Sequence, residues 1–302
     1  MKKTIYYLFA SAGIATMLVV GSCSKSETLP AIDGYNSSND VAKTNLVAHW
    51  TFDNTNNEVI SNTAPTLSKG KVSFTTGSIG QALKLDSGAL VFPAITKIGE
   101  ANALNNFTVS MWVSVQGTKK GTNYFSTFFS LAPTGVSDIW PDIFLGVETS
   151  RHLSTSDTLE LKGLMNTHPV GLPKDQEDNI AQPNPNLGQV DSGTGAWFMK
   201  SGDWTHFVLS WDATNHKFNI YGNGVSVGGY STRPNTGNEI LSSPVQAIFG
   251  SFPSSDLGFT SAPATQSWGP LVRASIDDVR IFNTTLAQKD VTALFDLGKA
   301  GR

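Results

Sequence analysis

The chain has 302 residues, a formal net charge of −3 and a charged fraction of only 15%. That length suits two domains or one large all-β domain, and the lack of a basic excess argues against a nucleic-acid partner. The abundance of glycine, with 28 residues, is typical of strands and turns rather than helices. Because Cys23 is the single cysteine, no intrachain disulfide can form.

The first 22 residues have the layout of an export signal. Lys2 and Lys3 precede an apolar run over residues 5–20, and Gly21 and Ser22 supply small residues before the cysteine. The apolar run is shorter than the ~20 residues of a membrane span, and the segment after it is polar. We therefore predict a signal peptide over residues 1–22 rather than a spanning helix.

Residues 18–23, with the sequence LVVGSC, resemble a bacterial lipobox. The resemblance implies that Cys23 carries lipid on its thiol and is the first residue of the mature chain. It further implies a Bacteroidota-type lipoprotein anchored to the outer membrane of the cell envelope, with surface exposure left open. A soluble secreted protein is the alternative. Residues 23–44, rich in Ser, Asn and Asp, are predicted to form a flexible tether.

From residue 45 to residue 302 the sequence predicts one domain made mainly of antiparallel strands. Short segments of apolar alternation are separated by Gly, Asn, Pro and Ser, unlike the pattern of βαβ units. The clearest strand covers residues 107–115, with Trp112 on one face and an apolar core face on the other. That core face carries Phe107, Val109, Met111, Val113 and Val115. Further strands are predicted over residues 46–52, 206–212, 217–221 and 274–282.

One tight turn and one helix complete the predicted elements. Asn223 and Gly224 suit a tight hairpin turn after the strand at residues 217–221. Near the C-terminus an apolar stripe indicates a helix, which Thr285 and Gln288 would begin with a capping box and Gly298 would end.

Six motifs occur in the order expected for one family. They are residues 46–53 (LVAHWTFD), 80–85 (GQALKL), 107–112 (FTVSMW), 203–206 (DWTH), 221–224 (YGNG) and 276–283 (IDDVRIFN). Together they resemble the LamG-like jelly-roll family of the concanavalin A-like lectin/glucanase superfamily. The resemblance implies an all-β fold, a two-sheet antiparallel jelly-roll sandwich with a short C-terminal helix. It indicates little about function, because one fold hosts many functions.

The superfamily includes glycan-cleaving enzymes, but their two-carboxylate pattern Glu-x-Asp-x-x-Glu is absent. The nearest acidic groups, Asp157 with Glu160 and the run at residues 175–178, lie in turn-rich sequence. Nothing there sets two carboxylates the ~5–9 Å apart that glycoside hydrolysis needs. Arg151 and His152, a candidate pair for a lyase, would face opposite ways on a strand. We therefore assign no catalytic residue.

Asp277 is the most informative acidic residue. It alternates with Val279 and Ile281 in the predicted last strand, which predicts a core-facing carboxylate that must be paired, hydrogen-bonded or bound to a metal. The family resemblance implies that the first and last strands lie antiparallel, which would bring Asp53 near Asp277. Two converging carboxylates would suit a structural Ca²⁺. The other interpretation is that backbone N–H groups, or a Lys or Arg, satisfy the Asp277 carboxylate.

The seven tryptophans fall into two groups. Those in strand-like motifs are predicted to pack the sheets: Trp50, Trp112, Trp204 and Trp211. Those in loops among Gly, Pro, Asp or Ser are candidates for stacking on the apolar face of a sugar: Trp140, Trp197 and Trp268. The alternative for each loop tryptophan is a plug at the edge of the sandwich.

These features together predict an envelope-anchored, non-catalytic carbohydrate-binding lipoprotein. Its expected partners are a polysaccharide or other glycan and, through the lipid anchor, a membrane, with no nucleic acid. A structural or adhesive sandwich that binds protein is the alternative from another class. A glycoside hydrolase or polysaccharide lyase is the third interpretation.

Overall fold

The computed structural model describes residues 29–115, 125–148, 160–167, 176–181, 202–215, 217–226, 231–232 and 245–302. The chain divides into two units, Met1–Pro30 and Ala31–Arg302, and every helix and strand below belongs to the second. The predicted signal peptide and Cys23 lie outside the described residues. Among the described helices, none has the length and apolar character that a membrane crossing requires.

Within the described residues, fourteen strands form one antiparallel sheet in the order β11-β10-β9-β4-β14-β3-β13-β5-β6-β7-β8. In addition β1 pairs with β14, β2 with β3 and β12 with β10. The strands are β1 (Leu46–Trp50), β2 (Leu67–Thr76), β3 (Gln81–Ala94), β4 (Phe107–Val115), β5 (Phe125–Pro133), β6 (Ile143–Glu148), β7 (Glu160–Thr167), β8 (Gln176–Ala181), β9 (Thr205–Asp212), β10 (Lys217–Gly222), β11 (Val225–Ser226), β12 (Ser231–Thr232), β13 (Val245–Phe249) and β14 (Val272–Phe282). The helices are α1 (Thr96–Gly99), α2 (Gln288–Lys299) and the 3-10 turns η1 (Ser38–Asp40), η2 (Lys43–Asn45) and η4 (Ser255–Leu257).

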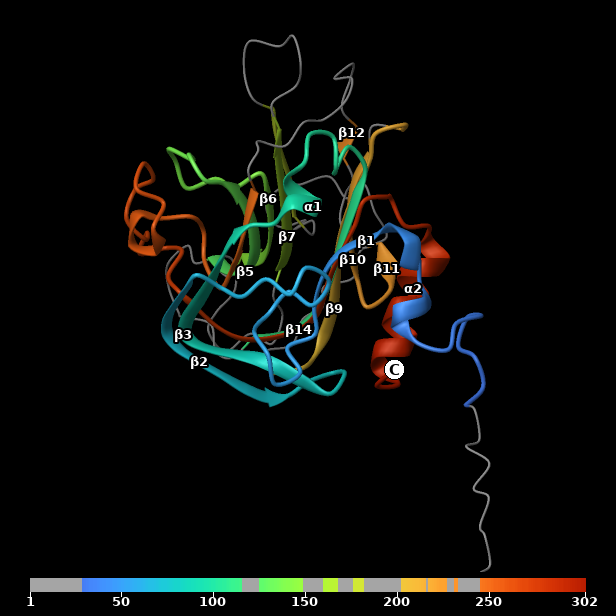
Figure 1. The fold of residues 1–302 in the computed structure, drawn as a ribbon. Coiled ribbons are helices and arrows are strands. Elements are labelled where there is room, and N and C mark those ends of the chain that lie inside the picture. The colour runs from blue at the N-terminus through green and yellow to red at the C-terminus, as the bar shows by residue number, and fades with distance from the viewer. Residues whose placement is uncertain are drawn as a thin grey trace, which may run out of the picture. The chain divides into compact units, whose positions relative to one another are not determined.

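The sheet curls over on itself and so forms two layers around one core (Figure 1). As a result β7 faces β9 and β10. A Cβ atom added to Gly163 would lie 2.4 Å from Leu209 Cδ1 and 2.9 Å from Ile220 Cγ2. This arrangement confirms the predicted two-sheet antiparallel jelly-roll sandwich, and α2 confirms the short C-terminal helix.

The inner faces of the two layers bury large apolar side chains. The predicted core face of β4 is confirmed, because all five of its alternating apolar side chains are fully buried. Trp50 of β1 lies at the centre of the core, with its ring edge-on to Phe249 at 5.2 Å and to Phe92 at 5.5 Å. Aromatic contacts of this kind contribute about 0.5–1.5 kcal/mol beyond the area buried. Trp50 and the equally buried Trp211 therefore pack the fold, as predicted.

α2 covers the outer face of the layer that contains β4, β9, β10 and β14 (Figure 1). Trp112, on the outer face of β4, stacks on Phe295 of the helix with 5.7 Å between ring centroids. Gly298 lies inside α2, where an added Cβ would be 2.3 Å from Trp112 Nε1. The close approach of this indole therefore explains the glycine better than the predicted helix end does.

The start of α2 also differs from the prediction. The helix begins at Gln288, after an N-cap alanine that makes no side-chain cap bond. Thr285 Oγ1 donates a hydrogen bond to the carbonyl oxygen of Trp211, and Gln288 Nε2 donates to that of Gly224 at 2.6 Å. These two side chains tie the connection before α2 to β9 and to the β10–β11 hairpin instead of forming a capping box.

Residues 31–41, which we call the N-terminal strap, are packed on the domain. Val41 is buried, and Ile32 and Tyr35 lie beside it in one apolar cluster with residues of α2. The Tyr35 hydroxyl donates to Asp290 Oδ1 of α2 at 2.7 Å. The packed unit begins at Ala31 rather than at residue 45, so the predicted tether over residues 23–44 is corrected for residues 31–44. The physical reason is that a few apolar side chains in this polar stretch cover α2.

The outer face of the other layer is covered by the loop at residues 250–271. Leu257 and Phe259 of this loop pack on outward side chains of β3, β5 and β13. Phe252 packs in the same way on Phe144 of β6 and Leu164 of β7. The loop and α2 lie on opposite sides of the sheets (Figure 1). Aromatic side chains that reach solvent beside the loop form the first candidate site.

Candidate functional site

Two of the predicted sugar-binding tryptophans come together on the outer face of β5, β6 and β7. Trp140 lies in the connection before β6 and Trp268 in the loop at residues 250–271, yet their ring centroids are 6.0 Å apart and their planes 31° apart. They belong to what we call the Trp140–Trp268 cluster, which also contains Phe125, Phe144, Leu164 and Phe252. Trp197, the third predicted tryptophan, lies outside the described residues.

Backbone hydrogen bonds hold both tryptophans in place. The N–H group of Trp140 donates to Asp138 Oδ1 at 2.7 Å, so the aspartate fixes the turn before β6. The carbonyl oxygen of Trp268 accepts a 2.7 Å hydrogen bond from the N–H group of Phe125, the first residue of β5. Trp268 is therefore attached to β5, whereas Trp140 is held by a turn within its own loop.

The Phe252 ring packs against both indole rings. Its ring is edge-on to Trp140 and to Trp268, at 5.6 Å from each, and it stacks on Phe144 at 4.9 Å. Gly269 makes room for it, because a Cβ atom there would lie 3.1 Å from the Phe252 ring. The two phenylalanines are buried and the two tryptophans partly exposed. The cluster therefore presents two indole rings to solvent, and these rings pack on buried phenylalanine rings.

Sequence reasoning identified the tryptophans of this cluster but not its phenylalanines. Phe252 stands alone between Ser251 and Pro253, with no periodicity to mark it. The available signal was the same one that identified the tryptophans, a large aromatic residue among Gly, Ser and Pro. That signal gives no information on which distant side chains the ring contacts.

A second candidate site lies where β1 and β14 meet. These strands pair antiparallel, with Trp50 opposite Val279, as the family resemblance implied. A pocket of about 90 Å³ opens there. It is lined by Ser38, Asn39, His49, Thr51, Asp53, Ile79, Asp277, Asp278, Arg280 and Arg302. The two predicted metal ligands, Asp53 and Asp277, therefore face one polar pocket.

Asp277 is fully buried, as predicted, but its side chain lies on the outer face of the sheet rather than on the core face. It pairs with Trp112, whose side chain is on the outer face of β4, while Ile276 and Val279 both point into the core. A β-bulge between Asp277 and Arg280 shifts the register. The bulge passes through Asp278, whose φ is +47°. The prediction that Asp277 faces the core is therefore wrong, because the extra residue of the bulge reverses the alternation of side chains along the strand.

One oxygen of Asp277 has no hydrogen-bond partner among the described residues. Oδ2 accepts a 2.9 Å hydrogen bond from the N–H group of Ile79, whereas the buried Oδ1 has no donor. Burial raises the pKa of Asp277 to about 8, against the opposing effects of the Ile79 N–H group and the neighbouring backbone N–H groups. A buried oxygen without a donor costs roughly 1–3 kcal/mol, so this carboxylate is suited to receive either a proton or a cation.

The turn at residues 77–81 lies against both carboxylates. Asp53 Oδ1 accepts a hydrogen bond from the N–H group of Gln81 at 2.7 Å. Cβ atoms added to Gly77 and Gly80 would lie 2.4 Å from Asp277 Oδ2 and 2.2 Å from Asp53 Oδ1. Gly80 also has a φ of +62°, which favours glycine. The two glycines therefore allow the turn to approach both aspartates.

Asp278 belongs to a buried ionic network that sequence reasoning missed. Burial alone would raise its pKa, but the Arg280 guanidinium and a hydrogen bond with His49 hold the pKa well below its usual range. Arg280 Nε lies 2.9 Å from Asp278 Oδ2, and His49 Nε2 lies 2.8 Å from Oδ1. Asp278 is thus engaged by two partners, which leaves Asp53 and Asp277 as the carboxylates available to a cation.

The donor chemistry of this pocket fits a hard cation. Two carboxylates, the Thr51 hydroxyl and the Asn39 amide line it, and Ca²⁺ takes six to eight oxygen ligands from such groups, backbone carbonyls and water. Across the described residues, no three His, Cys, Asp or Glu side chains are grouped closely enough to hold a metal. Backbone and water oxygens would therefore have to complete the coordination.

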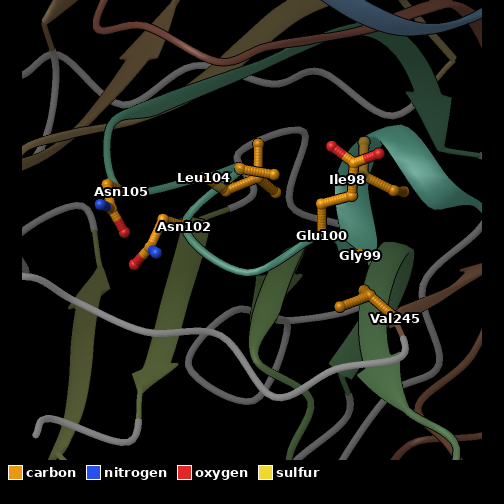
Figure 2. Close-up of a pocket in the computed structure, with 8 residues that line it drawn as sticks. Ile98, Gly99, Glu100, Asn102, Leu104, Asn105 and Val245 are labelled. Carbon is orange, nitrogen blue, oxygen red and sulfur yellow. The ribbon is translucent and has the colours of Figure 1, made fainter.

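A second hollow lies between α1 and β13 (Figure 2). Ile98 and Glu100 line one end of it, and Asn102 and Asn105 the other. Its volume is about 10 Å³, close to the space that one water molecule occupies. This hollow is therefore too small for a sugar or a peptide side chain.

The sequence matches no protein-family model and no curated protein. Solved structures do resemble it. The binding domain of botulinum neurotoxin serotype C1 is 14% identical, with a TM-score of 0.53 over 85% of this chain and 52% of that one. The fold is a concanavalin A-like jelly roll.

The chain is also similar to two further solved structures. The binding domain of Paraclostridial Mosquitocidal Protein 1 is 14% identical, with a TM-score of 0.53 over 84% of this chain and 52% of that chain. This chain therefore spans about half the length of the two binding domains. Domain 4 of AbnA, a GH43 extracellular arabinanase from Geobacillus stearothermophilus solved with arabinotriose, is 21% identical, with a TM-score of 0.48 over 82% of this chain and 97% of that one.

Proposed function

We propose that the protein is a non-catalytic carbohydrate-binding module and that glycans bind at the Trp140–Trp268 cluster. The observation that carries this proposal is the pair of partly exposed indole rings that pack on buried phenylalanine rings. Indole rings offer a large rigid surface with little conformational entropy to lose, and they stack on the apolar faces of sugar rings. Trp197, in the sequence between β8 and β9, is proposed as a further contact.

The Asp53–Asp277 pocket is smaller than a site that encloses a sugar. The Asp53–Asp277 pocket has about 90 Å³, whereas sites that enclose a small molecule have roughly 300–1,000 Å³. A glycosidase would have to place a sugar between two carboxylates, and this pocket cannot admit one. An exposed aromatic surface needs no enclosing cavity, because a long glycan can lie along it.

A protein-binding, adhesive role is the main rival. The binding domain of botulinum neurotoxin DC, 13% identical to this chain, has been solved with SialylT and with rat synaptotagmin II, at TM-scores of 0.52 and 0.53. At that identity the likeness concerns the fold alone, so the choice between partners rests on the tryptophans. Two partly exposed indoles side by side suit the ring of a sugar, and we retain protein binding as the alternative outcome of the test.

The test compares tryptophan variants with a matched exposed aromatic. Trp140→Ala and Trp268→Ala should weaken binding to a polysaccharide from a panel by roughly tenfold or more, measured by affinity gel electrophoresis and isothermal titration. Phe74→Ala, which removes a solvent-exposed ring on β2, should bind like the wild type. Unchanged affinity in both tryptophan variants would place the site elsewhere, and wild-type protein that binds no glycan would favour the adhesive role.

We also propose a finer family and a cellular setting. The six ordered motifs support a LamG-like module within the concanavalin A-like fold. The lipobox-like sequence before Cys23 supports a lipid anchor in the outer membrane of the cell envelope. Together they describe a glycan-binding lipoprotein held at the envelope.

A structural Ca²⁺ is proposed for the Asp53–Asp277 pocket. It is supported by the buried Asp277 Oδ1, which has no donor among the described residues, and by the oxygen-rich lining. Bound there, the ion would neutralise the two carboxylates and link β14 to the turn at residues 77–81 and to the segment after β1. The rival is a protonated, neutral Asp277 without metal.

A further inference from the structure

The N-terminal strap forms one wall of the Asp53–Asp277 pocket. We infer that a hard divalent cation in this pocket fastens the strap to the domain, so that release of the cation loosens residues 31–41. This inference rests on the Ca²⁺ site proposed above and goes beyond it, because the strap is the segment through which the chain leaves the packed unit toward Cys23.

The pocket is built from segments that are far apart in the sequence. The strap provides Ser38 and Asn39, the segment after β1 provides Thr51 and Asp53, and β14 provides Asp277. A cation that takes ligands from the carboxylates would therefore lie against the strap as well. An opening of the strap would remove one side of the pocket and expose the ion to bulk water.

Direct contacts already attach the strap at this point. Ser38 is buried, and Arg280 Nη2 donates to Ser38 Oγ at 2.8 Å while Nη1 donates to the Ser38 carbonyl oxygen at 3.3 Å. The same guanidinium binds Asp278, the residue next to Asp277. The strap, the ionic network and the proposed cation site are therefore contiguous.

Arg302 is also hydrogen-bonded to the strap. The N–H group of Ser38 donates to the carbonyl oxygen of Arg302 at 3.2 Å, and Arg302 Nη2 donates to the carbonyl oxygen of Asn36 at 2.7 Å. Arg302 also lines the pocket. Its positive charge repels a cation, but the carboxylates of Asp53 and Asp277 both face the pocket, and Asp278 neutralises Arg280.

The coupling has a quantitative consequence. If each opening of the strap requires loss of the cation, the open population falls by the factor 1 + [cation]/Kd. At a cation concentration of 100 times Kd, amides that exchange through this opening should therefore exchange about 100-fold more slowly. The reporters are the N–H groups of Ser38, Asp40 and Val41, which are bonded to Arg302, Ser37 and Ser38 respectively.

The experiment is hydrogen–deuterium exchange on the mature full chain, in CaCl₂ or in chelator, with Kd measured separately by titration calorimetry. Peptides covering residues 31–41 should exchange roughly 100-fold more slowly in CaCl₂ at 100 times Kd. Peptides covering residues 254–262, in the loop on the opposite outer face, should be unchanged. Asp277→Asn should abolish the difference, whereas Asp86→Asn, a surface partner of Lys71, should retain it.

The outcomes separate the inference from the site on which it rests. If calorimetry detects Ca²⁺ binding that Asp277→Asn abolishes, but residues 31–41 exchange equally with and without the ion, the strap is uncoupled and the inference is overturned. If calorimetry detects no binding to the wild type, the proposed Ca²⁺ site is itself wrong and the inference fails with it. Slower exchange confined to the strap and the pocket segments supports both.

Discussion

His206 is a buried titratable residue packed between Trp112 of β4 and Phe295 of α2. It is 1% exposed on β9, its Nε2 lies 2.8 Å from Ser110 Oγ, and its ring contacts Trp112 at 5.2 Å. Burial lowers its pKa to about 3, with a smaller opposing effect from Asp278. The domain therefore holds a neutral imidazole under α2, where a charged one would lack hydration.

This pKa predicts a pH dependence of stability. Because the unfolded histidine binds a proton below about pH 6.5 and the folded one only near pH 3, the free energy of unfolding should fall as pH drops between these values. By pH 4 the loss from this residue is on the order of 3 kcal/mol. Urea unfolding of wild type and His206→Gln at pH 7 and pH 4 checks it. Identical pH dependence in both proteins would contradict the prediction.

Asp277 gives a second prediction at the residue scale. If the pocket takes Ca²⁺, saturating CaCl₂ at 100 times Kd should stabilise the protein by about 2.7 kcal/mol, which corresponds to a rise in Tm of roughly 5–10 °C. Asp277→Asn keeps the shape but removes the charge, so its Tm should not respond to CaCl₂. Differential scanning calorimetry with and without chelator measures both. A wild-type Tm that is equal in CaCl₂ and chelator would favour the protonated carboxyl instead.

Asp277 also shows where prediction from sequence stops. Alternation along residues 274–282 correctly predicted a strand and a buried carboxylate, but the bulge at Asp278 reversed the facing of Asp277. A bulge depends on pairing with the neighbouring strand, which local pattern does not record. The convergence of Asp53 and Asp277 was expected from the family resemblance. The orphaned oxygen and the turn at residues 77–81 required the structure.

At the scale of elements, the contact between α2 and β4 reverses the effect that helix propensity predicts for one substitution in α2. Helix propensity alone predicts that Gly298→Ala stabilises α2 by about 1 kcal/mol. The structure predicts the reverse, because the new Cβ would lie 2.3 Å from Trp112 Nε1, closer than any real contact. We expect a lower Tm for Gly298→Ala by thermal melting. Gly135→Ala, with open space around it, is the matched control, and a raised Tm for Gly298→Ala would contradict the packing.

The same scale explains which elements the sequence could predict. Strands such as residues 107–115 carry strict alternation because one face is core and the other is covered, and they were found where expected. The strap was assigned to the tether because Ile32, Tyr35 and Val41 are sparse and show no period. Their packing partners in α2 are more than two hundred residues away, so only the folded chain shows that they are part of the domain.

At the scale of the whole packed unit, different segments pack on the outer faces of the two sheet layers. α2 and the strap cover one, and the loop at residues 250–271 with the Trp140–Trp268 cluster covers the other. The chain enters the unit on the strap side, at Ala31. Under the proposed function, the anchor therefore attaches to one face and the glycan contacts the opposite face. A long polysaccharide could then lie on the cluster without competing with the anchor for the same surface.

The last prediction concerns that anchor. Cys23→Ser should move the protein from the membrane fraction to the soluble fraction, because each buried lipid methylene contributes about 0.8 kcal/mol to membrane binding and no other anchor is proposed. Its Tm and glycan affinity should equal those of the delipidated wild type, because the packed unit begins at Ala31, beyond the substituted residue. Ser24→Ala, one residue further on, is the matched control and should stay in the membrane fraction. The readouts are cell fractionation and metabolic labelling with a fatty-acid analogue. Wild-type protein that takes up no label would show that the lipobox-like sequence is not processed, and the envelope location would then need another cause.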